Sequence, residues 1–326
     1  MKNWKWYMTV AILVLCLTVL SACSGSQNSG SAASGETGGG SGSSDDQITI
    51  GVSYQNLQNE FIINIQDALQ AKAKELGIKL IETDGQGKAE NQISQIENFI
   101  TQKVDAIILN PFDKNGSAPA VDKAVAANIP IIVLNAQVAN MDKVTTYVGS
   151  DDHEAGKIEM QYIADLLGGK GNIVILHGPN GHSAEVARTE GNKEVLAKYP
   201  DIKILAEQTA NWDRAQALSL MENWIQSDMH IDAVVAQNDE MALGAYKAVE
   251  AAKLQDKIKI IGIDAIPDAL KAVEEGKLVA TVYQDARGQG EKAVEMAVKA
   301  AKGEPTEKTV YIPFQLVTKD NLNQFK

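Results

Sequence analysis

The sequence predicts an α/β protein made of two similar lobes, and three observations lead to that class. Short apolar segments alternate with longer amphipathic ones through most of the 326 residues. The apolar segments are continuous, which is typical of parallel strands covered by helices on both faces. About ten such strands fall into two sets of five. A closed barrel of eight strand–helix units is the main alternative, which the strand count and a break near 149–151 disfavour.

Strands and helices alternate in the first half from residue 47 onward. The predicted strands are Ile48–Ser53, Ile78–Glu82, Ala106–Leu109, Ile129–Leu134 and Val144–Val148. A helix is expected over Phe61–Leu76, because its apolar residues recur every three or four positions before a stop at Gly77. Further helices are expected through Ile96 and through Val121.

The second half repeats this rhythm. Its predicted strands are Asn172–Leu176, Ile202–Ala206, Ala233–Ala236, Ile258–Ile263 and Leu278–Val282. Its predicted helices cover 154–167, 184–198, 213–226, 240–252, 267–275 and 286–301. The repetition is the reason to expect two similar lobes, each a parallel sheet with helices on both faces.

Composition excludes several functional classes. Asp and Glu number 42 against 30 Lys and Arg, and this net charge of −12 disfavours nucleic acid or an anionic membrane surface as partner. Two Cys and four His argue against a disulfide scaffold and a His-built metal centre. The chain carries no Gly-x-Ser-x-Gly elbow, Walker loop or His-Glu-x-x-His motif. We therefore expect no enzyme, cofactor or bound metal; turnover of a candidate ligand would revive the enzyme alternative.

The N-terminus indicates where the protein is located. Lys2 and Lys5 precede an apolar run that ends in Leu-Ser-Ala-Cys23, which resembles the lipobox of bacterial lipoproteins. We predict a signal peptide over 1–22, an acylated Cys23, and a flexible Ser/Gly linker up to residue 46. The protein would then be anchored by lipid to the extracytoplasmic side of the cell membrane. An ordinary signal peptide or an uncleaved N-terminal anchor are the alternatives.

Polar residues follow several predicted strands at their carboxyl ends. They are Asn110, Asn135, His177, Asn238 and Asp264. Ligands of open parallel sheets bind at this edge, and planar amide and carboxylate groups can each bond two neighbouring hydroxyls. The alternative for each position is a turn or a helix cap.

Three larger side chains complete the candidate site. Trp212 stands among polar residues, where an indole can stack on the C–H face of a sugar ring. Phe61 opens a predicted helix and is a second stacking candidate, with a core position as the alternative. The fork of Arg188 could hold two hydroxyls; the alternative is a surface ion pair with Glu185 or Glu190.

Three motifs carry a resemblance to a known family. The segments 236–245 (AQNDEMALGA), 262–269 (GIDAIPDA) and 181–188 (GHSAEVAR) resemble the pentose/hexose group of type 1 periplasmic binding proteins. These are the solute receptors of sugar ABC importers, and the likeness spans 47–326. Ribose-, galactose/glucose- and inositol-binding proteins are the nearest groups.

The resemblance implies an architecture and a set of contacts. Three crossings near 149–152, 283–285 and 311–314 would form a hinge between lobes of 47–150 plus 285–312 and of 151–284 plus 313–326, with the ligand cleft between them. The implied ligand contacts are Gln55, Asn59, Phe61, Asn110, Asn135, His182, Arg188, Trp212, Asn238, Asp264 and Gln284. His177 is not among them, so we interpret it as a turn or core residue.

Departures from the family pattern bear on the ligand. Ribose-binding proteins have Asp-Arg where this chain has Asn135-Ala136, which disfavours ribose. Asn135, His182 and Trp212 follow the galactose/glucose pattern, although Ala136 and Ala184 replace its Lys and Asp. The calcium loop of those proteins has no counterpart in 166–170, which lacks carboxylates.

The resulting expectation is a monomeric receptor of an ABC sugar importer that closes on a monosaccharide and docks on a permease. An aldohexose such as glucose or galactose is favoured, with inositol or a pentose as alternatives. A lipoprotein that presents sugar to a membrane signalling receptor is another possibility. The sensor half of a lac-repressor-type regulator is disfavoured, because no helix-turn-helix precedes the lobes.

Overall fold

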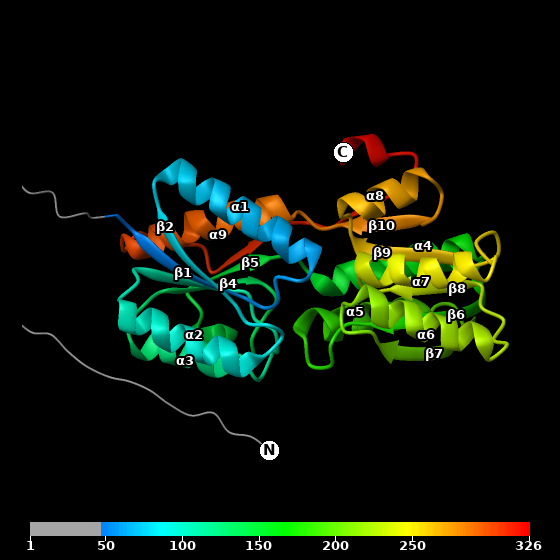
Figure 1. Cartoon of the computed structure of the whole chain (residues 1–326), viewed down its shortest axis with the longest axis horizontal. Helices are drawn as coiled ribbons and strands as arrows, with labels where there is room; N and C mark the ends of the chain where they lie inside the picture. Colours follow the sequence, from blue (N-terminus) through cyan, green and yellow to red (C-terminus); the bar gives the residue numbers. More distant parts are fainter. Residues whose placement is uncertain (1–46) are drawn as a thin grey trace, which may run out of the picture. The chain divides into compact units, whose positions relative to one another are not determined.

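Two six-stranded sheets organise the protein (Figure 1). The structure is a computed structural model that describes residues 47–326, and these form one compact unit. The predicted signal peptide, Cys23 and the Ser/Gly linker lie outside the described residues. Within 47–326, no helix is both long enough and apolar enough to span a membrane.

The first lobe is built on a sheet whose strand pairs are all parallel, in the order β11-β5-β4-β3-β1-β2. Its strands are β1 (Thr49–Tyr54), β2 (Lys79–Asp84), β3 (Ala106–Leu109), β4 (Ile131–Asn135), β5 (Thr146–Gly149) and β11 (Thr309–Tyr311). Its helices are α1 (Glu60–Leu76), α2 (Ala89–Gln102), α3 (Ala118–Ala126), α9 (Ala286–Ala301) and the short 3₁₀ turn η1 (Met141–Lys143). Helices α1 and α9 pack together on one face, and α2 and α3 cover the other (Figure 1).

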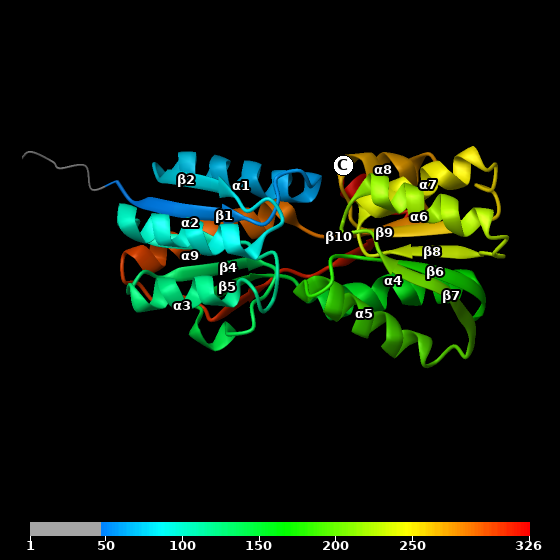
Figure 2. The ribbon, with the colours of Figure 1, turned by 60° about the horizontal axis from the view of Figure 1, so that its bottom comes forward.

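The second lobe has the same strand arrangement, β12-β10-β9-β8-β6-β7, with only β12 antiparallel to its neighbour. Its strands are β6 (Lys170–His177), β7 (Asp201–Thr209), β8 (Ala233–Ala236), β9 (Lys259–Asp264), β10 (Ala280–Tyr283) and β12 (Gln315–Val317). Its helices are α4 (Asp152–Leu166), α5 (Ser183–Leu196), α6 (Arg214–Gln226), α7 (Asp239–Ala251), α8 (Pro267–Glu274) and the turn η2 (Leu322–Gln324). The predicted fold class, two similar lobes with helices on both faces of each sheet, is confirmed (Figure 2).

Each lobe contains one strand that was not predicted from the sequence. Strands β11 and β12 have three residues each, which is too short to show a periodic pattern. Both are edge strands, and both belong to the last part of the chain, which returns once to each sheet. Each sheet therefore has six strands where five were predicted.

Both faces of the inner strands are buried, which explains their continuous apolar sequences. In β3, Ile107 and Leu109 pack into the cluster under α2 and α3, and Ile108 belongs to the cluster on the opposite face. In β6, Ile175 and Leu176 likewise enter different clusters. A period of two thus divides each strand between two cores.

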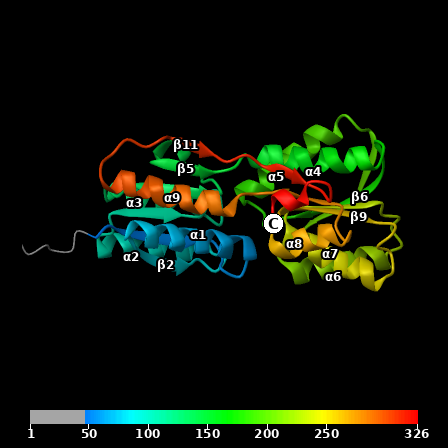
Figure 3. The same cartoon turned by 90° about the horizontal axis from the view of Figure 1, so that it is seen from above.

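The chain passes between the two sheets three times. The connecting segments are 150–151 after β5, 284–285 after β10 and 312–314 after β11. Figure 3 shows these segments running from one lobe to the other. All three begin at carboxyl ends of strands, so the crossings border the region that both sets of carboxyl ends face.

Gly51 in β1 supplies a test of the first lobe's packing. An added Cβ would lie 2.6 Å from two atoms of the buried Phe99 ring. Gly51→Ala should lower the free energy of unfolding by about 1–3 kcal/mol, because overpacking displaces the ring.

Chemical denaturation of Gly51→Ala, Phe99→Leu and the double variant measures this coupling. The shorter Leu should accept part of the added methyl group, so the two losses should fall short of additivity by at least ~0.5 kcal/mol. Strict additivity would contradict the contact as the cause.

Candidate functional site

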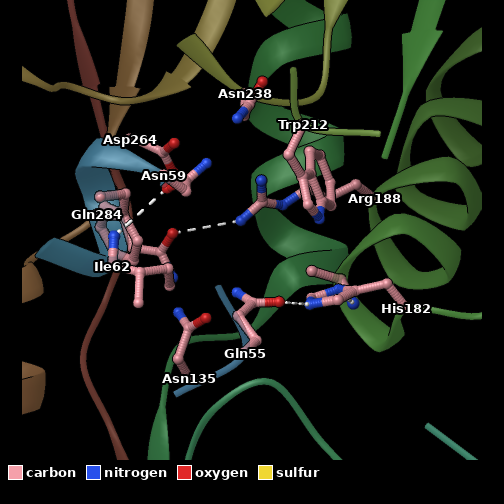
Figure 4. Close-up of a pocket in the computed structure, with 12 residues that line it drawn as sticks. Gln55, Asn59, Ile62, Asn135, His182, Arg188, Trp212, Asn238, Asp264 and Gln284 are labelled. Atoms are coloured by element: carbon pink, nitrogen blue, oxygen red, sulfur yellow. Dashed lines mark hydrogen bonds between the residues drawn. The ribbon is translucent and has the colours of Figure 1, made fainter. Parts of the chain in front are cut away.

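A small cavity of about 30 Å³ lies where the carboxyl ends of both sheets meet. Its walls come from both lobes and one crossing, and the labelled side chains converge on a common space (Figure 4). The lining residues are Gln55, Asn59, Phe61, Ile62, Asn135, His182, Ala184, Arg188, Trp212, Asn238, Asp264 and Gln284. In each lobe the cavity adjoins the point where strand order reverses, β1/β3 and β6/β8, as in other open parallel sheets.

Ten of the eleven predicted contact residues line this cavity, and Asn110 does not. Asn110 is completely buried behind the wall: its Oδ1 accepts from the Gln55 backbone N–H (3.2 Å) and its Nδ2 donates to the Leu134 carbonyl (3.2 Å). It therefore positions Gln55. Sequence reasoning overlooked Ile62 and Ala184, although the position of Ile62 next to Phe61 at the start of α1 could have indicated it.

Arg188 lies at the centre of the site and is 4% exposed. Its Nε and Nη2 both donate to Asp152 Oδ1, at 2.9 and 2.8 Å. Nη1 donates to the Gln237 carbonyl, and Nη2 to Gln284 Oε1 at 3.3 Å. The alternative of a surface ion pair with Glu185 or Glu190 is wrong, since the partner carboxylate is the buried Asp152.

Close contact between α4 and α5 brings these two groups together. An added Cβ on Gly156 of α4 would lie 2.1 Å from the Arg188 carbonyl oxygen, and one on Gly191 of α5 would lie 2.2 Å from the His153 carbonyl oxygen. Any larger residue would separate the helices. The two glycines thus set the spacing between α4 and α5, and hence the distance between Arg188 and Asp152.

Asp264 is the last residue of β9, and it lines the cavity. The side chain is 6% exposed, and no other described residue hydrogen-bonds to it. Burial raises the pKa of Asp264 well above its usual value, while the Arg188 guanidinium acts in the opposite direction. Asp239 supports the following loop by accepting from the Ile266 backbone N–H at 3.1 Å.

Three cavity residues adopt left-handed backbone conformations. The φ angles are 68° at Asn135, 60° at Trp212 and 128° at Asp264. Such conformations cost about 1–3 kcal/mol each for residues other than glycine and persist only where the surroundings impose them. At Asn135 one such restraint is the Tyr147 hydroxyl, which donates to the Asn135 carbonyl at 2.7 Å. Because three such residues lie around one cavity, we infer that the surrounding structure holds their side chains in defined orientations toward it.

His182 is neutral, and its tautomer follows from its contacts. Burial and, to a smaller extent, the nearby Arg188 guanidinium lower the pKa of His182 to about 3. Nδ1 accepts from the Ala184 backbone N–H (3.2 Å) as the cap of α5, so Nε2 carries the proton and donates to Gln55 Oε1 (3.0 Å). This bond joins the two lobes.

Two asparagines act both as helix caps and as cavity residues. Asn59 Oδ1 accepts from the Ile62 N–H at the start of α1 (3.3 Å), and Asn238 Oδ1 accepts from the Met241 N–H at the start of α7 (3.0 Å). Capping uses the oxygens and leaves each amide NH₂ directed to the cavity wall. The capping alternative is thus confirmed for Asn238, and both residues also line the cavity.

Trp212 rests on a glycine. An added Cβ on Gly178 would lie 2.0 Å from the indole, so only glycine permits this placement. The ring packs edge-to-face on His182, with centroids 5.5 Å apart, and the Arg188 guanidinium carbon lies 5.6 Å from its centroid.

Phe61 lines the cavity and also belongs to the core. His177 lies outside the lining and contacts Glu207 and Thr189.

Glu159 is a second buried carboxyl group on α4, near Arg188 of α5. It is completely buried, and neither of its carboxylate oxygens has a hydrogen-bond partner among the described residues. Burial raises the pKa of Glu159 to about 8. The unfolded chain loses this proton near pH 4.5, so the folded state binds one more proton across the window between the two values.

Glu159→Gln should therefore flatten the stability profile. In the natural protein this group makes unfolding easier as pH rises from about 4.5 to about 8, by up to ~1 kcal/mol per pH unit. Denaturant midpoints at pH 5, 6.5 and 8 measure the slope. The exposed Glu154 on the same helix offers the matched control Glu154→Gln. If stability changed with pH in the same way in Glu159→Gln and in the natural protein, Glu159 would not hold the extra proton in the folded state.

The described residues contain no cluster of three or more His, Cys, Asp and Glu side chains arranged to hold a metal ion.

Comparison with known proteins identifies the family. A model of the periplasmic binding protein domain matches residues 50–305. A putative rhizopine-binding protein of Rhizobium meliloti is 40% identical over 85% of this chain and 92% of its own. A xylitol-binding protein of Mycolicibacterium smegmatis is 40% identical over 85% of this chain and 79% of its own.

Solved structures agree with these matches. An ABC transporter solute-binding protein of Bacillus halodurans with bound myo-inositol superposes with a TM-score of 0.83 and 44% identity, over 86% of this chain and 97% of that one. The resemblance inferred from the three sequence motifs is thereby confirmed. Both sheets have the same strand arrangement, and the family model matches most of the chain. The chain therefore belongs to the periplasmic binding protein family, in the type 1 pentose/hexose group.

Proposed function

We propose that this chain is the extracytoplasmic solute-binding protein of an ABC sugar importer and binds one neutral polyhydroxylated ring in the cavity. One observation carries the proposal: polar groups that have no hydrogen-bond partner among the described residues converge there from both lobes and a crossing. They include the Asp264 carboxylate and the buried Gln284 Nε2. A ligand rich in hydroxyls would supply the missing partners.

The electrostatics favour a neutral ligand. Asp152 pairs with Arg188, and the carboxyl group of Asp264 also acts on that guanidinium. An anionic ligand would add charge to a site in which carboxyl groups already outnumber the guanidinium. Neighbouring hydroxyls can donate to Asp264 and accept from Arg188, and the indole of Trp212 offers a face for C–H groups.

Two ligand classes are candidates. The pattern Asn135, His182 and Trp212 favours an aldohexose. A cyclitol is supported by the 44% identical structure with bound myo-inositol. We therefore place myo-inositol first among the ligands to test and the aldohexoses second.

Contacts between the lobes support binding by closure. Besides the bond between His182 and Gln55, the Lys114 N–H donates to the Gly181 carbonyl (3.0 Å) and the Gln137 N–H to Ser183 Oγ (2.7 Å). These bonds join the ends of the lobes beside the cavity. Closure around the crossings would report occupancy to a permease, with the lipid on Cys23 holding the receptor at the membrane. A growth defect on the ligand after deletion would distinguish import from signalling.

Titration calorimetry of the purified protein tests the ligand class. The panel is myo-inositol, xylitol, D-glucose, D-galactose and D-ribose. We expect at least one dissociation constant of about 10 μM or lower, which corresponds to roughly −7 kcal/mol. Affinities weaker than about 1 mM for every compound would overturn the sugar-binding proposal.

Asp264→Ala tests the binding mode. Loss of a charged acceptor should weaken affinity for the panel ligand about tenfold or more, since hydrogen bonds to charged groups contribute ~1.5–3 kcal/mol. The matched control is Asp268→Ala, because Asp268 lies four residues further along but outside the cavity lining and is exposed. Equal affinities of the two variants would remove Asp264 from the site.

A further inference from the structure

A second and larger cavity adjoins the first. Its volume is about 330 Å³, and it shares Gln55, Asn59 and Trp212 with the ligand cavity, so these three side chains lie at the boundary between the two. We call it the outer chamber. Its remaining walls are Asn56, Gln58, Phe112, Asn211, Asp213, Arg214, Ala215 and Glu240.

The outer chamber presents an aromatic residue from each lobe. Phe112 belongs to the first lobe and Trp212 to the second, and both are half-buried. Phe112 is one of only five Phe in the chain. Its position is fixed, because its backbone N–H donates to Gln92 Oε1 (3.0 Å) and its ring lies over Gly87, 3.6 Å from where a Cβ would stand. Aromatic faces flanked by amide side chains are suited to the C–H surfaces and hydroxyls of a sugar ring.

The charges of the chamber favour a neutral occupant. Among the described residues that line it, Arg214 is the only cation, and its Nε donates to Glu240 (2.6 Å) while Nη1 donates to Asp268 (3.1 Å). Two carboxylates therefore already compensate that guanidinium. A phosphate or carboxylate on the ligand would meet no free positive charge within this lining.

We propose that the outer chamber binds a second neutral ring or ether group, so that the protein accepts glycosides of the ring held in the inner cavity. This inference rests on the proposed function, since it requires a ring in the inner cavity. The glycosidic bond would pass between Gln55, Asn59 and Trp212. Phe112 would contact the second ring only, because it lines the outer chamber and not the inner cavity.

Paired probes test the proposal by calorimetry. Each parent ring is compared with a glycoside: myo-inositol with galactosyl-myo-inositol, D-glucose with maltose, and D-galactose with melibiose. At least one glycoside should bind within about tenfold of its parent, equivalent to ~1.4 kcal/mol. If a parent binds and all three glycosides are weaker by about a hundredfold or more, the chamber is only a water-filled entrance. If no parent and no glycoside binds, the proposed function fails and this inference with it.

Substitutions of Phe112 test whether this side chain contacts the second ring. Phe112→Ala should weaken the glycoside about 3- to 10-fold, as expected from loss of an aromatic contact, and leave the parent ring unchanged. Phe112→Leu keeps an apolar surface and should restore part of the affinity. Equal effects of Phe112→Ala on parent and glycoside would overturn the assignment, because they would indicate a change in the whole cleft.

Discussion

The buried pair of Arg188 and Asp152 is the interaction on which the site depends. It joins α5 to the start of α4, immediately after the first crossing between the lobes. The same guanidinium reaches the Gln237 carbonyl after β8 and Gln284 in the second crossing. One side chain thus links three segments that are distant in sequence. A buried ion pair gives little net stability, and its value here lies in orienting donors toward the cavity.

The neighbourhood of Arg188 is arranged at a cost in stability. Among the described residues, Glu159 is buried without hydrogen-bond partners, the Asp264 carboxylate accepts no hydrogen bond, and several backbones have positive φ. These features are expensive in a folded protein and are typical of sites preorganised for a ligand. The surrounding strands, buried on both faces, supply the stability that maintains them.

Much of the fold followed from periodicity, because the inner strands and the helices are long enough to show it. Ala106–Leu109 and Ala233–Ala236 were predicted with their observed bounds, whereas the edge strands β11 and β12 were not predicted. Among candidate site residues, those at strand ends and helix caps could be found because turn chemistry and binding chemistry use the same amides. Asn110 could not be assigned correctly, since a sequence does not say whether a strand-end side chain faces the cavity or supports its wall.

The sequence alone determined the α/β class, the two similar lobes, the family and most of the residues around the cavity. Only the tertiary structure decided which partner Arg188 has, which atoms of Asn59 and Asn238 stay available, and that Phe112 faces an outer chamber. The physical reason is the range of the forces involved. Hydrophobic periodicity is encoded locally along the chain, whereas ion pairs, cavities and unpartnered polar atoms depend on segments that meet only after the chain has crossed between the lobes.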